Sequence, residues 1–329
     1  MIDFRYHVVS LVSVFMALAI GVVLGAGPLK EAIGNQLSNE VEGLRRDKTA
    51  LQQAVANRDQ RIAHRDSFIS AVAPALVAGQ LGGRSVVLVT LPGTTRDVPE
   101  ALSGQLEAAG ATVTGRVDLQ NRWVDPGQQE FRKTVAAGQV QYVDPRPPAS
   151  AGPQGELAAV LARAVLTRDI AQVGQADTNA DTIMGALTGG GLVKVEGQPA
   201  ARASLAVVLA PEPTKAPGAG DDQWTQSTTA SVTALLSALD AAGNGTVLAG
   251  PLAAAQKSGL LAGVRSGDLA STVSTVDTVD SPMGQVDVVL ALREQLADQA
   301  GHYGFGDGAT APIPPLPQAT ATATQGSGG

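Results

Sequence analysis

Residues 8–26 read VVSLVSVFMALAIGVVLGA, a run of 19 residues without a charged side chain near the start of a 329-residue chain. At about 1.5 Å of rise per residue, a helix of this length spans a hydrocarbon core of roughly 30 Å. The run therefore predicts a transmembrane helix at 8–26, preceded by a short cytoplasmic N-terminus at 1–7.

A cleaved signal peptide is the alternative interpretation of this segment. Signal peptides combine a basic start with an apolar core of about 7–15 residues and small residues at positions −3 and −1 of the cleavage site. Here Asp3 accompanies Arg5, the core is longer, and a cut after Ala26 places Leu24 at position −3. These features favour a retained signal-anchor. Basic residues lie on both sides of it, so we expect an extracytoplasmic body only because a lone N-terminal apolar segment normally directs export.

Small residues recur every four positions along this helix, at Ser13, Ala17, Gly21 and Gly25. Such a face lets two helix backbones approach closely in a membrane, and Gly21 and Gly25 form a GxxxG pair. Glycine and alanine are also common in membrane helices that do not pair. The face predicts self-association of the anchor.

A heptad pattern follows the anchor over residues 29–72. Apolar residues at the first and fourth heptad positions predict a parallel two-stranded coiled coil, although Lys48, Arg58 and Arg65 interrupt the pattern. The alternative is one amphipathic helix that packs along its own globular domain. The predicted seam consists of Val41, Leu44, Leu51, Val55, Ile62 and Ile69.

An extracytoplasmic domain at 84–305 is predicted to be α/β with a mostly parallel sheet. Ser85–Leu91 is a continuous apolar run bounded by Pro92-Gly93, which is typical of a strand buried on both faces. A helix at 97–109 and a strand at 111–119 complete a βαβ unit, which implies a right-handed parallel crossover. Later segments repeat this alternation, with a last helix at 284–300. The tail at 308–329 is rich in Pro, Thr, Ala and Gly and is predicted to be disordered.

The composition excludes several classes of function. A net charge of −7 argues against nucleic-acid binding, because neutralising phosphates needs a basic surface. The chain has no cysteine, so thiol catalysis is excluded, and it contains no Walker A, GxSxG or HExxH motif. We therefore expect no enzymatic activity and no evident cofactor. Asp277 and Asp280 follow a predicted strand and form a weak candidate carboxylate site, although capping or turn formation is the commoner use of such residues.

The N-terminal MIDFRYHVVSLVSVFMALAIGVVLGAGPL (1–29) and the C-terminal VDSPMGQVDVVLALREQLADQAGHYGFGDGATAPIP (279–314) resemble the actinobacterial MctB family of copper transporters. The resemblance implies a cell-envelope location and a role in copper export or homeostasis, and copper is expected only on this ground. Some relatives are linked instead to the control of cell separation through peptidoglycan hydrolases.

The ligands that copper prefers are scarce in this chain. Cu(I) favours thiolates and thioethers, and Cu(II) favours imidazoles. Met184, Met283 and His302 are weak candidate ligands, and no two of them lie close in sequence. One membrane helix per chain does not line a pore by itself. The residues alone therefore favour a homodimeric scaffold that binds an envelope partner, such as a cell-wall hydrolase in cell separation, whereas the resemblance favours copper.

Overall fold

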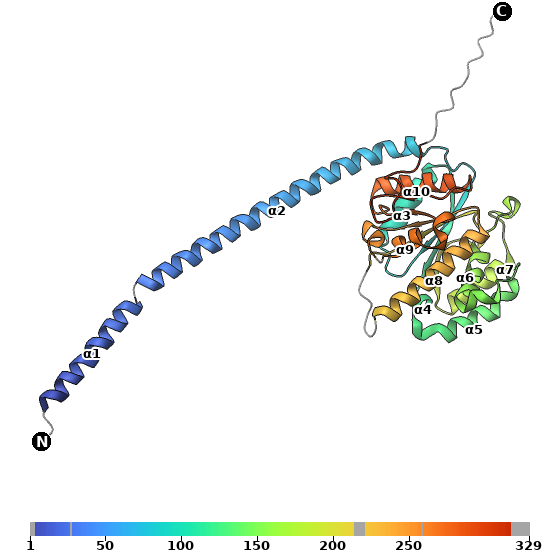
Figure 1. The fold of residues 1–329 in the computed structure, drawn as a ribbon. Coiled ribbons are helices and arrows are strands. Elements are labelled where there is room, and N and C mark those ends of the chain that lie inside the picture. The colour runs from blue at the N-terminus through green and yellow to red at the C-terminus, as the bar shows by residue number, and fades with distance from the viewer. Residues whose placement is uncertain (1–3, 27, 214–220, 258, 317–329) are drawn as a thin grey trace, which may run out of the picture. The chain divides into compact units, whose positions relative to one another are not determined.

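The computed structural model describes residues 4–26, 28–213, 221–257 and 259–316. These residues form two compact units, one within 1–65 and the other within 66–329. The first unit contains helix α1 (Phe4–Ala26) and most of helix α2 (Pro28–Val77). The second contains the last turns of α2 and the α/β fold that follows it (Figure 1).

Helix α1 includes the apolar run and begins four residues before it. In the described part of the chain, Phe4–Gly25 is the one helix long and apolar enough to cross a membrane. Its described side chains are exposed in the single chain, as expected for a segment whose partners are lipids or other helices. Arg5 and His7, which we expected in a separate N-terminus, belong to its first turn.

Helix α2 continues beyond the expected end of the heptad segment. The heptad segment was expected to end at residue 72, but α2 includes Pro74 and ends only at Val77. Ala73, Val77 and the following Leu81 are completely buried in a core cluster of the second unit. Burial of these apolar side chains offsets the loss of one backbone hydrogen bond at Pro74.

A seven-stranded sheet organises the second unit, in the order β3-β2-β1-β4-β5-β6-β7. All neighbouring strands are parallel except β3, which runs antiparallel to β2. The prediction of a mostly parallel α/β sheet is therefore confirmed. The strands are β1 (Ser85–Thr90), β2 (Thr112–Leu119), β3 (Val193–Gly197), β4 (Leu205–Leu209), β5 (Thr246–Ala249), β6 (Ser274–Val276) and β7 (His302–Tyr303).

Helices cover both faces of this sheet (Figure 1). In β1, Val87 and Val89 face one core cluster while Val86 and Leu88 face the other, which explains the continuous apolar run in the sequence. The end of α2 lies on one face with α3 (Asp97–Ala108) and α10 (Pro282–Gln295). The other face carries α4 (Asn121–Val124), α5 (Gln129–Gln139), α6 (Gly152–Val165), α7 (Thr178–Gly189), α8 (Asp221–Ala242) and α9 (Leu260–Ser266).

The C-terminal region differs most from the expectation. Helix α10 ends at Gln295 rather than at residue 300, in a turn where Asp298 has a φ of +54°. Residues 308–316, which we expected to be disordered, contact the domain. Ala311 forms a bridge with Tyr303, and the carbonyl of Pro315 accepts a hydrogen bond of 2.6 Å from Arg293. The rest of the predicted tail, 317–329, lies outside the described residues.

Candidate functional site

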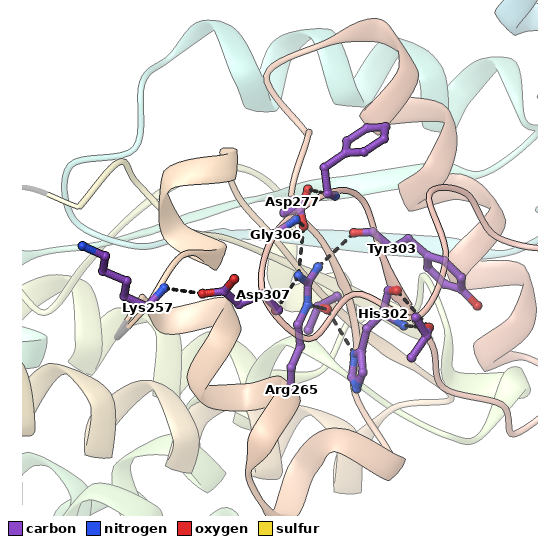
Figure 2. Close-up of polar contacts among 10 residues, drawn as sticks. Lys257, Arg265, Asp277, His302, Tyr303, Gly306 and Asp307 are labelled. Atoms are coloured by element: carbon purple, nitrogen blue, oxygen red, sulfur yellow. Dashed lines mark hydrogen bonds and ion pairs between the residues drawn. The ribbon is translucent and has the colours of Figure 1, made fainter.

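A buried ion pair lies at the carboxyl end of β6, where Asp277 faces Arg265 of α9 (Figure 2). Arg265 Nη1 lies 2.9 Å from Asp277 Oδ2, and the two side chains are 1% and 0% exposed. The backbone N–H groups of Phe305 and Gly306 donate to the two carboxylate oxygens at 2.9 and 2.8 Å. Each oxygen of Asp277 is thus held by donors from the chain itself.

Arg265 is held as completely as its partner. Its Nε donates to Thr275 Oγ1 at 2.8 Å, and its Nη2 donates to the carbonyl of Tyr303 at 2.9 Å. Nη1 also reaches the carbonyl of Asp307 at 3.1 Å. The pair therefore joins α9, β6, β7 and the loop 304–308. Four of the five N–H donors of Arg265 are engaged within the chain, which suits the pair to holding this loop and not to binding a ligand.

Gly304 lets the loop approach the carboxylate closely. Its φ is +119°, a conformation that L-residues rarely adopt, and a Cβ built there would overlap the carboxyl group of Asp277. This contact gives a physical reason for one glycine of the GFGD sequence at 304–307.

Asp277 and Asp280 do not form the paired carboxylate site that we considered. Asp277 is buried in the ion pair, whereas Asp280 is exposed in the turn before α10. The acidic residue that Asp277 influences is Asp287 of α10, which is 1% exposed. Burial and the negative charge of Asp277 raise the pKa of Asp287 to about 7. Our sequence reasoning missed Asp287, although an aspartate inside the run VDVVLAL was a visible signal.

Tyr303 and His302 of β7 complete the polar surroundings of this loop. The Tyr303 hydroxyl donates a short hydrogen bond to Glu294 of α10. The pKa of Tyr303 is raised, mainly by burial and also by this hydrogen bond. His302 Nδ1 lies 3.1 Å from Thr275 Oγ1. Burial and the charge of Arg265 lower the pKa of His302, so its imidazole is neutral at pH 7.

The three candidate copper ligands have separate environments. Met184 is buried in α7, which packs beside β3, whereas His302 lies on β7 at the opposite edge of the sheet. Six strand spacings of about 4.8 Å place these edges roughly 29 Å apart. Met283 is half-buried in the first turn of α10. Among the described residues, no group of three or more His, Cys, Asp or Glu side chains is placed to hold a metal ion.

The two predicted helix surfaces both lie within the described residues. A Cβ built on Gly21 or Gly25 of α1 meets open space, and Ser13 Oγ bonds to the carbonyl of Val9. Most of the predicted seam of α2 is exposed in the single chain, including Leu44 at 66% and Leu51 at 67%. Apolar side chains of this size on one stripe of a helix are unusual without a partner.

Comparison with known proteins gives matches over most of the chain. The family model described as "Copper transport outer membrane protein, MctB" matches residues 1–314. The chain belongs to the MctB family. A relative from Mycobacterium tuberculosis named "Copper transporter MctB" is 30% identical over 316 residues, which are 94% of this chain and 98% of the relative. The Mycobacterium leprae protein of the same name is 30% identical over 322 residues, with the same coverage.

Membership of the MctB family and the apolar helix α1 together place this protein at a membrane or cell envelope. The family match includes the apolar helix α1, the long helix α2, the sheet and the loop 304–308 beside Asp277. It ends at residue 314, close to the last residue that the structure describes.

Proposed function

We propose that this protein serves copper export or copper homeostasis at the cell envelope. The observation that carries the proposal is the match over residues 1–314 to a family described by copper transport. The relatives named copper transporters also align with 94% of the chain, so the resemblance is not confined to one shared domain.

The way in which the chain would handle copper follows from where its soft ligands lie. Met184 and His302 lie at opposite edges of the sheet, and His302 is engaged by Thr275. We therefore propose that copper is handled by an assembly of chains or with a partner protein, without an enzymatic step. A path through the membrane would need several copies of α1, because one helix encloses no pore.

We further propose that the chains associate as parallel homodimers, with the N-terminus in the cytoplasm and the α/β unit outside. Two surfaces support association: the small-residue face of α1 and the exposed apolar seam of α2. Both would pair in the same parallel sense, because α1 and α2 follow each other directly in the chain.

A second candidate function is supported by the same seam. A dimeric helix pair that carries an α/β unit can act as an interaction scaffold for an envelope partner, such as a cell-wall hydrolase active in cell separation. The observation that favours this function is the exposed apolar surface of α2, because such a surface binds proteins more readily than metal ions.

The test is complementation of a strain that lacks this protein. If the copper role holds, the deletion strain is sensitive to copper, and the full-length chain restores growth without changing cell separation. A strain with normal copper tolerance but unseparated, chained cells would contradict the copper role and favour the scaffold.

A Cu(I) competition titration on the full-length protein in zwitterionic nanodiscs distinguishes direct copper binding by one chain from handling that needs an assembly of chains or a partner protein. We expect weak binding at most, since Met184 and His302 lie at opposite edges of the sheet and the described residues contain no group of three or more His, Cys, Asp or Glu side chains placed to hold a metal ion. Tight stoichiometric binding by a monomer would overturn the proposal that an assembly or a partner is needed.

A further inference from the structure

A second site lies between α6 and α8, on the sheet face that also carries α9. This α6–α8 groove is bordered by the proline-containing segment 143–148 and has a volume of about 1130 Å³. Ala159 and Ala162 of α6 and Ala234 and Ala238 of α8 line it. Because alanine side chains are short, two facing helices with alanine at these positions leave an apolar trough between them. The volume is sufficient for a ligand of drug or lipid-fragment size.

Two arginines at the groove share the carboxylate of Asp177. Arg163 Nη2 and Arg202 Nη2 each lie 3.0 Å from Asp177 Oδ2. Asp177 also caps α7, where its Oδ1 accepts hydrogen bonds from the backbone N–H groups of Asn179 and Ala180. Arg202 Nη2 also donates to Gln172 Oε1 at 2.6 Å, and the charge of Asp169 acts on Arg202 as well. Asp177 still serves two guanidinium groups and a helix end, so these partners do not engage every donor of the two arginines.

Arg163 and Arg202 keep unpaired donors although they are largely removed from solvent. Arg202 is only 6% exposed, and burial together with the charge of Arg163 lowers its pKa. Arg202 Nε and Arg163 Nη1 are buried without a hydrogen-bond partner among the described residues. Unsatisfied charged donors are costly in a folded protein, and a site built to receive an anion is a common reason for keeping them.

The wider lining has the same sign of charge. It contains four arginines, at positions 146, 163, 168 and 202, and one aspartate, Asp144, while Asp177, Asp169 and Asp240 act on these arginines from outside the lining. Arg168 is fixed by hydrogen bonds of 2.9 Å to the carbonyls of Gly243 and Asp240. Arg146 is exposed on the bordering segment. In a chain with a net charge of −7, this gathering of arginines at one groove marks a local attraction for anions.

We propose that the α6–α8 groove binds an organic anion with an apolar body, such as an alkyl phosphate or an alkyl carboxylate. The head group pairs with Arg163 and Arg202, and the alkyl part lies in the alanine-lined trough. A carboxylate or phosphate matches the planar guanidinium groups, and the trough provides apolar contact that a free inorganic anion cannot use. This binding function is separate from copper and from the seam of α2.

Calorimetric titration with octyl phosphate tests the proposal, using the full-length protein in zwitterionic nanodiscs and empty nanodiscs as the blank. We expect saturable binding, weakened about tenfold or more by Arg163→Gln, because a charge-assisted hydrogen bond is lost. Ala234→Leu, which fills the trough, is expected to weaken binding to a similar extent. The matched controls Arg96→Gln and Ala137→Leu change exposed residues outside the groove and should leave affinity unchanged.

Two further ligands separate the parts of the proposal. Inorganic phosphate and 1-octanol should each bind much more weakly than octyl phosphate, since each lacks one half of the recognised structure. Equal affinity for inorganic phosphate, equal affinity for octanol, or no octyl phosphate binding would each overturn the proposal. If Arg163→Gln fails to fold, the exposed Arg146→Gln replaces it and should weaken binding several-fold. Hydrogen exchange should show ligand-dependent protection within 155–167 and 230–242, and protection elsewhere alone would contradict the site.

Discussion

At the scale of single residues, the Arg265–Asp277 pair shows why a buried ion pair can be structural. Removing both charges from water costs several kcal/mol per ion, and only good geometry with additional hydrogen bonds offsets this cost. Here Thr275 and the carbonyl of Tyr303 accept from Arg265, while Phe305 and Gly306 donate to Asp277. The result is a loop whose path is specified by charge as well as by packing.

Replacing Arg265 by methionine tests this role. We expect Arg265→Met to lower the free energy of unfolding by about 3 kcal/mol or more, because Asp277 is left buried without its cation. Lys133→Met is the matched control, since Lys133 is 57% exposed and 3.8 Å from Glu130, and it should cost less than about 1 kcal/mol. Urea unfolding followed by circular dichroism measures both. Equal small losses would show that the pair does not hold the loop.

Asp287 predicts a dependence of stability on pH. Its carboxyl group ionises near pH 4 when unfolded but has a pKa of about 7 when folded, so the folded state retains a proton between these values. Stability should therefore fall as the pH rises from about 4 to 7, by up to about 4 kcal/mol, and then level off. His302 has a lowered pKa in the folded protein and acts in the opposite direction. Its contribution to the stability of the fold is lost as the pH falls below the pKa of this histidine in the unfolded chain.

The variant Asp287→Asn isolates the first effect. We expect it to be more stable than the wild type at pH 8 and to lose most of this advantage at pH 4, with thermal melts at both values as the measurement. Asp280→Asn is the control, because Asp280 is exposed, and its pH dependence should follow the wild type. An Asp287→Asn protein that keeps the wild-type pH dependence would exclude Asp287 as the source.

At the scale of elements, helix α2 serves two different environments along its length. Its last turns bury Ala73 and Val77 in the α/β unit, whereas Val55 and Ile62 of the seam are 46% and 38% exposed. The chain itself therefore buries the apolar side of α2 only near the C-terminal end of this helix. The remaining stripe predicts a partner, and the heptad spacing favours a second copy of the same helix.

Charges placed in the seam test this pairing. The double variant Val55→Glu, Ile62→Glu would bring like charges together at two core positions of a coiled coil. We expect it to raise the dissociation constant of the dimer at least tenfold. Gln53→Glu, Gln60→Glu adds the same two charges on the opposite face of the helix and should leave the dimer intact. The mass of the full-length protein is measured by light scattering over a dilution series. A monomeric wild type, or equal effects of both variants, would contradict the pairing.

At the scale of the whole molecule, the sheet separates residues that copper binding would need together. Met184 and His302 lie at opposite edges, while four of the arginines line the groove between α6 and α8. The anion binding that we propose for the α6–α8 groove is therefore not apparent from the net negative charge of the chain. The MctB membership and the apolar helix α1 place the protein at a membrane or cell envelope.

Local patterns in the sequence were sufficient for the long apolar helix, the heptad helix and the mostly parallel sheet. The run at 8–26, the heptads at 29–72 and the apolar strand at 85–91 each have a period or a length that sterics and burial impose on neighbouring residues. Helix ends were less predictable, because Pro74 and the last turns of α10 depend on contacts with distant segments. The residues at 1–29 and 279–314 were sufficient to indicate the family, which the match over 1–314 confirms.

Only the tertiary structure decided which polar residues meet. Asp277 was noted beside Asp280, yet its partner is Arg265 and its influence falls on Asp287. The groove joins Arg163 and Arg202, which are far apart in sequence, around Asp177. Charge pairing has no sequence period, because it depends on how parallel strands and crossover helices bring distant loops to one place. The sequence by itself therefore determined the elements and their class, and the fold determined the sites.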